Sequence, residues 1–135
     1  METVRTRRAA NDLRYTVKAR QHEITTDAEI NDGGTDLGAT PHELLAAALA
    51  GCTSITVQMY ANRKGGPLKS CDTEVRLTSG EKTDVNSPTV FEVKVWLEGE
   101  LTVEQRERLL EIANRCPVHR ALTRPISIRV SAGQL

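Results

Sequence analysis

The chain has 135 residues, of which 39% are hydrophobic, and this length and composition suit one domain with one modest core. Its 18 Lys and Arg residues balance its 18 Asp and Glu residues, so no net charge attracts it to nucleic acid or to an anionic membrane surface. We therefore expect a single domain over residues 1–135 that binds neither nucleic acid nor membranes.

The N-terminus and the cysteine content both favour a reducing cytoplasm. Residues 1–5 contain no apolar stretch of the kind found in secretory signals. Three cysteines in a chain of this length do not resemble a disulfide framework. The uncharged stretch 44–62 is about long enough to span a bilayer. Its second half, however, contains Thr53, Ser54, Thr56 and Gln58, so we interpret it as a buried helix of a cytoplasmic protein.

The first third of the chain predicts strands followed by a loop. Apolar and polar residues alternate over residues 3–7, 13–19 and 22–26, which is typical of strands. Asn11 with Asp12, and Arg20 with Gln21, supply the expected turns. Residues 31–38 contain the glycine, Asn and Asp residues of a loop that could approach a ligand closely.

A long helix is expected to begin after Thr40. This threonine is a suitable N-cap, Pro41 suits the first helical position, and Glu43 is placed to complete a capping box. The helix should run to about Arg63, where residues 64–67 (Lys-Gly-Gly-Pro) end it. Because residues 44–51 are apolar on nearly every side, we expect other elements to enclose this helix.

The remaining elements complete an α+β order. Strands are expected over residues 71–78 and 89–98, joined by a loop at 81–87, and the single tryptophan, Trp96, should pack on a helix or at a dimer interface. A second helix should open at Thr102 with a Gln105 capping box and carry a surface pair of Glu104 and Arg108. Pro117 should end it, before a short turn at 117–122 and a last strand at 126–130.

Two of the three cysteines occupy distinctive positions. Cys116 precedes a proline that can start a helical turn, and Arg115, His119 and Arg120 are close in sequence. Free amides and cations both stabilise thiolate over thiol, so local sequence predicts that Cys116 is more acidic than Cys52, which lies in the middle of the long helix. The alternative is that each is a small buried hydrophobe, as free cysteines usually are, and we expect this for Cys71.

Two segments resemble the OsmC/Ohr family, named for osmotically inducible protein C and organic hydroperoxide resistance protein. They are residues 41–52 (Pro-His-Glu-Leu-Leu-Ala-Ala-Ala-Leu-Ala-Gly-Cys) and residues 116–122 (Cys-Pro-Val-His-Arg-Ala-Leu). The resemblance extends over nearly the whole chain. It implies an OsmC-like fold with antiparallel sheets wrapped around two central helices, an intertwined homodimer with active sites at the subunit interface, and reduction of organic hydroperoxides.

The resemblance also implies roles for individual residues. Cys52 would be the peroxidatic thiol and Cys116 the resolving thiol, linked by an intramolecular disulfide that a dithiol such as a dihydrolipoyl group reduces. No metal and no bound cofactor are expected. This assignment reverses the order of acidity predicted from local sequence, so a cation must reach Cys52 through the fold. Arg20 is our candidate, with a solvated charge at a strand end as the alternative.

The residues at the start of the long helix depart from the family pattern. The best-defined peroxidases have a glutamate directly after the proline, whereas this chain has His42 there and Glu43 one position later. One position turns a side chain by about 100° around a helix, so Glu43 does not simply inherit the role, and the capping box is its preferred interpretation. His42 is either a titrating neighbour of the thiols or a surface residue.

Three functional hypotheses follow. The first and favoured one is a thiol-dependent peroxidase. The second is a non-enzymatic dimeric module that binds a hydrophobic ligand or metabolite. The third is a metal site formed by Cys52, Cys116 and either His119 or His42, although these spacings match no standard zinc pattern.

Overall fold

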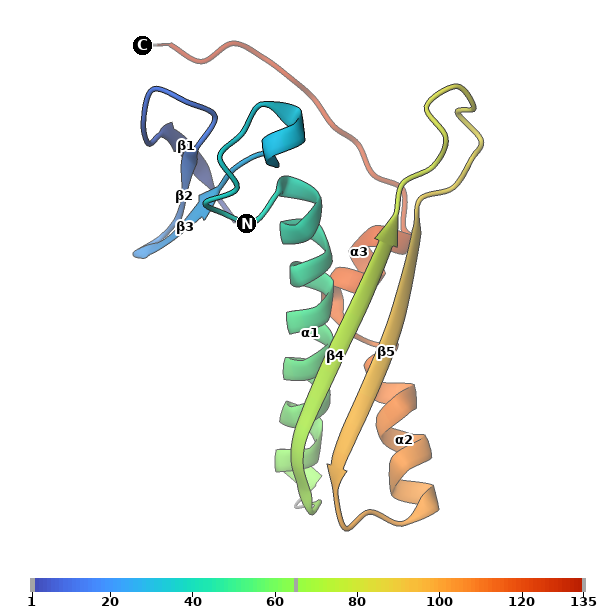
Figure 1. The fold of residues 1–135 in the computed structure, drawn as a ribbon. Coiled ribbons are helices and arrows are strands. Elements are labelled where there is room, and N and C mark those ends of the chain that lie inside the picture. The colour runs from blue at the N-terminus through green and yellow to red at the C-terminus, as the bar shows by residue number, and fades with distance from the viewer. Residues whose placement is uncertain (1, 65, 135) are drawn as a thin grey trace. The chain divides into compact units, whose positions relative to one another are not determined.

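The computed structural model describes residues 2–64 and 66–134, and it has the α+β composition expected from the sequence (Figure 1). The chain divides into two compact units, Met1–Ala47 and Ala48–Leu135. The long helix α1, Pro41–Lys64, begins in the first unit and ends in the second. We describe each unit by itself.

The first unit is built on a three-stranded antiparallel sheet. Its strands are β1 (Arg5–Arg8), β2 (Tyr15–Ala19) and β3 (His22–Thr26), paired in the order β1-β2-β3. All three predicted strands are present, and β3 has the predicted bounds. Ala19 pairs with His22, which leaves Arg20 and Gln21 as the turn, and Arg20 takes a left-handed conformation with φ of 57°. The predicted turn is therefore confirmed.

A buried carboxylate organises the segment after β3. Asp27 is 3% exposed and accepts hydrogen bonds from the Thr35 hydroxyl (2.6 Å), the Leu37 amide (3.0 Å) and the Ala28 amide (2.7 Å). These donors, led by the Thr35 hydroxyl, lower the pKa of Asp27 to about 2. Within the predicted loop the structure also has a short 3-10 helix, η1 (Ile30–Asp32), which the sequence did not indicate.

The start of α1 has the predicted cap. Thr40 N donates to Glu43 Oε1 (2.8 Å), and Glu43 N donates to Thr40 Oγ1 (3.2 Å), so the two residues form a capping box. The helix ends at Lys64, one residue beyond the expected position. The pKa of Glu43 is lowered, chiefly by the Thr40 amide that its carboxylate accepts.

The second unit places two helices against a long hairpin (Figure 1). The hairpin strands are β4 (Leu68–Thr78) and β5 (Val90–Gly99), and the helices after it are α2 (Val103–Ala113) and α3 (Pro117–Thr123). The core cluster draws on α1, β4 and α2 through Val57, Ala61, Leu68, Cys71, Leu109 and Ile112. A capping box between Thr102 and Gln105 starts α2, as the sequence predicted.

Along α1, the buried residues form a single narrow stripe. Leu49, Thr53, Val57 and Ala61 are spaced four residues apart and face the rest of the second unit. By contrast, Ile55 is 61% exposed and Met59 60% exposed. Within the second unit the hairpin and α2 cover one face of this helix, and enclosure of its other face by further elements, as in the expected homodimer, remains a prediction.

The predicted last strand is absent from the described residues. Residues 124–134 have no regular structure, and Ile126, Ile128 and Val130 are 63%, 83% and 93% exposed. A strand requires a neighbour for its backbone hydrogen bonds, and this segment pairs with none of the strands described here. Apolar and polar residues do alternate over residues 126–130, but no described strand lies beside them to form the backbone hydrogen bonds of a sheet.

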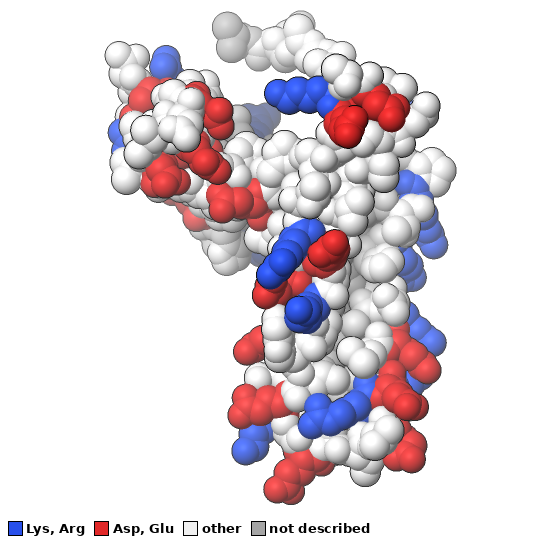
Figure 2. Space-filling view, turned by 45° about the vertical axis from the view of Figure 1, so that its right-hand side comes forward, with Lys and Arg blue, Asp and Glu red and all other residues white. Residues whose placement is uncertain are grey.

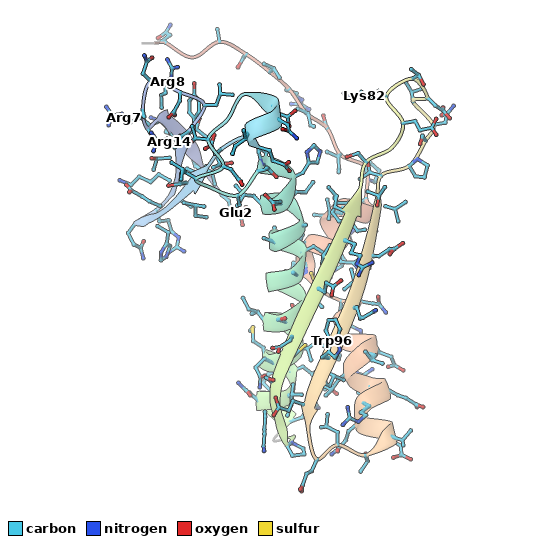
Figure 3. The ribbon with its side chains drawn as sticks, viewed as in Figure 1. Glu2, Arg7, Arg8, Arg14, Lys82 and Trp96 are labelled. Atoms are coloured by element: carbon cyan, nitrogen blue, oxygen red, sulfur yellow. The ribbon has the colours of Figure 1, made fainter. Side chains whose placement is uncertain are left out.

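Trp96 and Arg108 have different outcomes. Trp96 projects from β5 (Figure 3), is 49% exposed and lies beneath Lys94 Nζ, 5.9 Å from its ring centroid, so it does not pack on a helix of its own unit, and its alternative position at a dimer interface remains a prediction. Arg108 forms its ion pair with Glu111 (2.8 Å) rather than with Glu104. The Arg108 Nε also donates to the Tyr60 hydroxyl (3.1 Å), which draws the guanidinium away from Glu104.

Charged side chains of both signs are intermixed on the face that Figure 2 shows. This distribution agrees with the balanced composition of the chain. The visible face therefore presents no continuous field of one sign.

By length and composition, α1 alone among the helices described could cross a membrane. Core helices of soluble proteins pass the same test, and the buried stripe on α1 agrees with such a core position.

Candidate functional site

The second unit brings Cys52 and Cys116 together. Cys52 lies on α1, next to the buried stripe, and Cys116 lies where the chain breaks between α2 and α3. The Cys52 thiol is near enough to raise the pKa of Cys116, so the two side chains are neighbours, and all three cysteines are free thiols. Cys116 is 0% exposed whereas Cys52 is half-buried. A solute therefore meets the Cys52 sulfur before it meets that of Cys116.

Cys116 is held by the helix that it begins. As the N-cap of α3 it has extended backbone angles (φ −60°, ψ 134°), and Pro117 occupies the first helical position. The backbone amide of His119 donates to Cys116 Sγ at 3.3 Å, while Cys116 O accepts from the Arg120 amide at 3.1 Å. The Cys-Pro sequence thus fixes the sulfur at a helix N-terminus, as the sequence indicated.

The pKa of Cys116 is nevertheless raised. Burial is the largest cause, followed by the neighbouring Cys52 thiol, and these outweigh the His119 amide and the Thr53 hydroxyl, which act in the opposite direction. The expectation of an acidified Cys116 is therefore wrong, because the sulfur is fully enclosed. Local sequence showed the amide donor but could not show the burial.

Thr53 is a site residue that the sequence did not single out. It is 2% exposed, its hydroxyl donates to Leu49 O at 2.8 Å, and it is near enough to Cys116 to lower the pKa of that thiol. A hydroxyl within the buried stripe of an apolar helix is the signal that could have identified it, since buried polar groups require partners. Thr53 therefore connects α1 to the Cys116 sulfur.

A hollow of about 230 Å³ lies beside this cluster. Thr53 and His119 line it, and so do Val93, Val95, Leu110, Ala113 and Asn114. The residues that contact Cys116 thus also border open space, with apolar side chains of β5 and α2 on the other sides.

The third cysteine belongs to the core. Cys71 is 8% exposed in the hydrophobic cluster, and burial is the largest cause of its raised pKa. It pairs across the hairpin with Leu97. Its position is that of a structural thiol, as expected.

The other three candidate residues belong to the first unit. Arg20 lies in the β2–β3 turn, where its Nη1 donates to Gln21 Oε1 at 3.5 Å. His42 and Glu43 are exposed in the first turn of α1, and the capping box engages Glu43. Their relation to the thiols remains a prediction.

Among residues 2–64 and 66–134, the side chains of His, Cys, Asp and Glu form no group of three or more that could hold a metal ion. The suggested cluster of Cys52, Cys116 and a histidine is therefore not assembled in the part of the chain described. The chemistry available at this site comes from the two thiols, the Thr53 hydroxyl and the His119 amide.

Comparison with known proteins identifies the family of the chain that carries these two thiols. A family model described as OsmC-like protein matches residues 32–131, which include both cysteines. The chain belongs to the OsmC-like family. A search of curated protein sequences gave no significant match.

Solved structures share the OsmC-like fold. An OsmC-like protein from Mycoplasma pneumoniae aligns with a TM-score of 0.76 and 20% identity, covering 90% of this chain and 86% of that one. An organic hydroperoxide resistance protein from Elizabethkingia anophelis gives a TM-score of 0.65 with 20% identity, covering 91% and 88%. A protein named organic hydroperoxide resistance protein OsmC, from Legionella pneumophila, gives 0.60 with 21% identity, covering 91% and 89%.

Proposed function

We propose that this OsmC-like protein is a cysteine-based peroxidase that reduces organic hydroperoxides in the cytoplasm at the expense of a dithiol. The neighbouring positions of the Cys52 and Cys116 thiols, both inside the segment that the family model matches, carry the proposal. Membership of the OsmC-like family supports it, as does the shared fold with proteins named for organic hydroperoxide resistance.

The exposures of the two sulfurs support separate roles. In the first step the Cys52 thiolate attacks the terminal oxygen of the hydroperoxide, the O–O bond breaks, and a proton completes the alcohol that leaves. Cys52 is then a sulfenic acid. Half-buried Cys52 suits this step because the peroxide must reach it, whereas Cys116 is enclosed.

Cys116 then resolves the sulfenic acid. Its sulfur attacks that of Cys52, a disulfide forms, and water leaves. The raised pKa of Cys116 keeps it mainly as a thiol, which protects it from direct oxidation until Cys52 has reacted. An external dithiol, such as a dihydrolipoyl group, exchanges with the disulfide, restores both thiols and becomes oxidised itself.

The exposed apolar side chains support a homodimer. Ile55 and Met59 leave an apolar face of α1 open to solvent, and the apolar residues of the tail are exposed as well. Such surfaces on a monomer mark interaction sites, and we propose that a second copy of the chain covers them. In that assembly Arg20 is our candidate for the cation that serves the Cys52 thiolate, and His42 is a candidate neighbour of the thiols, with no catalytic role required of Glu43.

The decisive experiment oxidises the protein with one equivalent of cumene hydroperoxide and maps the disulfide by peptide mass spectrometry. We expect a Cys52 to Cys116 link. Cys52→Ser should abolish turnover with dihydrolipoamide, and Cys116→Ser should leave a sulfenic acid on Cys52 that dimedone traps.

Cys71→Ser is the matched control and should retain activity, since that thiol lies in the core. A disulfide that includes Cys71, or a fully active Cys52→Ser protein, would contradict the proposal. Slow reaction of every thiol would instead favour the non-enzymatic binding module.

A further inference from the structure

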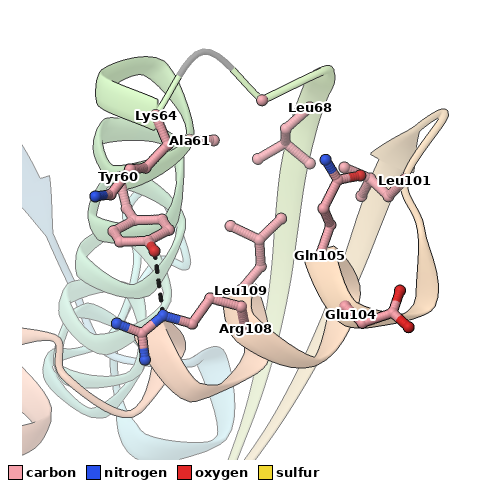
Figure 4. A pocket seen from close by; sticks show the side chains of 10 residues that line it. Tyr60, Ala61, Lys64, Leu68, Leu101, Glu104, Gln105, Arg108 and Leu109 are labelled. Atoms are coloured by element: carbon pink, nitrogen blue, oxygen red, sulfur yellow. Dashed lines mark hydrogen bonds between the residues drawn. The ribbon is translucent and has the colours of Figure 1, made fainter.

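We propose that the second unit has a separate binding site for a small monoanion with an apolar body, such as a medium-chain carboxylate. The site is a pocket of about 400 Å³ between the end of α1 and the start of α2 (Figure 4). Its volume falls within the range of about 300–1,000 Å³ that is usual for small-molecule sites. The proposal does not depend on the thiol chemistry.

The pocket lies further along α1 than Cys52 does. Tyr60, which lines it, follows Cys52 by eight residues, or about 12 Å along the axis of α1. The pocket and the hollow beside Cys116 share no lining residue. A ligand in this pocket therefore has no contact with the reacting sulfurs.

The body of the pocket is apolar. Ala61, Leu68, Leu101 and Leu109 form its walls, and Ala61, Leu68 and Leu109 also belong to the hydrophobic core. Close packing holds such residues in place, so these walls are preformed. They would take up a short hydrocarbon chain by removing its surface from water.

Three side chains with nitrogen donors, those of Lys64, Gln105 and Arg108, also line the pocket. Arg108 is fixed in place, since Nε donates to the Tyr60 hydroxyl at 3.1 Å and Nη1 pairs with Glu111 at 2.8 Å. Its guanidinium carbon lies 5.5 Å from the Tyr60 ring centroid, and Lys64 Nζ lies 5.9 Å from the same centroid. Glu111 pairs with Arg108, so Lys64 is the lining cation without an ion pair among the described residues, and it can meet one negative charge on a ligand.

Gln105 supplies an oriented neutral donor. Its Oε1 accepts the Thr102 amide in the capping box at 2.8 Å, so the carboxamide cannot turn freely, and its nitrogen is directed toward the pocket (Figure 4). The Glu104 carboxylate also borders the pocket but points away from its centre (Figure 4). The inner surface thus presents N–H groups to a carboxylate.

The test titrates octanoate, below the concentration at which it forms micelles, and follows binding by NMR. Octan-1-ol is the uncharged probe of equal chain length. We expect octanoate to shift the Gln105 side-chain amide and the Leu109 methyl signals, and to bind roughly tenfold or more tightly than octan-1-ol, since a hydrogen bond to a charged group is lost. Equal affinities would overturn the proposal, and so would shifts centred on Ile55 and Met59.

Gln105→Glu is the sharpest variant. It retains an oxygen for the Thr102 amide, and glutamate is a usual residue in a capping box, so the fold should be preserved. It also replaces the donor by a negative charge, and octanoate affinity should fall roughly tenfold or more. Gln21→Glu makes the same charge change in the β2–β3 turn and should bind octanoate like the wild type.

Two further variants distinguish a failure of this binding site from a failure of the proposed peroxidase activity. Lys64→Gln should weaken octanoate binding and leave octan-1-ol unaffected. Cys52→Ser should bind octanoate with unchanged affinity, so the pocket can be validated even if the proposed peroxidase activity fails. Wild-type octanoate affinity in Gln105→Glu would refute the site.

Discussion

Thr53→Val removes one buried hydroxyl and changes the shape of the side chain little. In the wild type this hydroxyl donates to Leu49 O at 2.8 Å and lies near the Cys116 side chain, whose pKa it lowers. Leu49 O can still accept the helical amide of residue 53 in the variant, so no buried acceptor is left without a donor. We expect a loss of about 1 kcal/mol in the free energy of unfolding, the usual net value of one hydrogen bond.

The same substitution should slow disulfide formation. The Thr53 hydroxyl lowers the pKa of Cys116, because its single hydrogen can turn from Leu49 O to the sulfur when Cys116 ionises, so its removal raises the pKa of Cys116 further. Attack on the Cys52 sulfenic acid requires that thiolate. The loss of a hydrogen bond worth about 1 kcal/mol should reduce the rate roughly fivefold at neutral pH, and the rise of the rate with pH should move to higher pH.

A single-turnover experiment measures this rate. Cys52 is oxidised with excess cumene hydroperoxide, the remaining thiols are blocked at timed intervals with N-ethylmaleimide, and the disulfide is quantified by mass spectrometry between pH 6 and pH 9. Thr53→Ser keeps the hydroxyl and should retain the wild-type pH profile. If the valine variant forms the disulfide at the wild-type rate and with the wild-type pH profile, Thr53 has no influence on Cys116 and the reasoning is refuted.

Two more substitutions test the first unit. Asp27→Asn removes a carboxylate whose pKa falls from 3.8 to about 2 on folding. A carboxylate with a lowered pKa stabilises the fold at pH values above its pKa in the unfolded chain, so the variant should be less stable than the wild type at pH 7. The difference in unfolding free energy between the two proteins should shrink as the pH falls from about 4 to 2. Urea unfolding followed by circular dichroism at pH 7, 4 and 2.5 measures this, and a difference that is independent of pH would contradict it. Glu43→Gln keeps an oxygen for the Thr40 amide, so peroxide turnover and helix content should be nearly unchanged; a large loss of turnover with normal circular dichroism would assign the carboxylate a catalytic role.

Local signals in the sequence were sufficient for most element boundaries. Thr40, Pro41 and Glu43 fixed the start of α1, and Thr102 with Gln105 fixed that of α2, since both capping boxes are present. These motifs act through backbone amides within one turn, so they can be read without knowledge of the fold. The α+β class followed from the order of such elements.

The features that the sequence could not supply depend on distant contacts. The alternation at Ile126 and Ile128 predicted a strand, but a strand also requires a partner, which the described chain does not provide. The pKa of Cys116 depends on burial by α1, which its neighbours in sequence do not show. The 3-10 helix at Ile30–Asp32 lies within a loop that Asp27 organises through residues eight and ten positions later.

Only part of the candidate site could be predicted from the sequence, because the rest of it depends on contacts between residues that are distant in the chain. Cys52 and Cys116 stood out because each lies in a short motif. Thr53 and the contact between Tyr60 and Arg108 could not be recognised in the sequence, because each joins α1 to another helix. The expected ion pair of Glu104 with Arg108 was wrong since a residue from another element competed for the guanidinium.

The position of Cys116 as the cap of α3 has a mechanical consequence. Its sulfur accepts the His119 amide at 3.3 Å, and a disulfide to Cys52 would draw that sulfur to about 2.05 Å from its partner. If the Cys116 sulfur makes part of that approach, it either lengthens its contact with the His119 amide or draws the first turn of α3 with it. In both cases the surroundings of this amide change on oxidation, so the backbone amide signal of His119 would report the redox state of the two thiols.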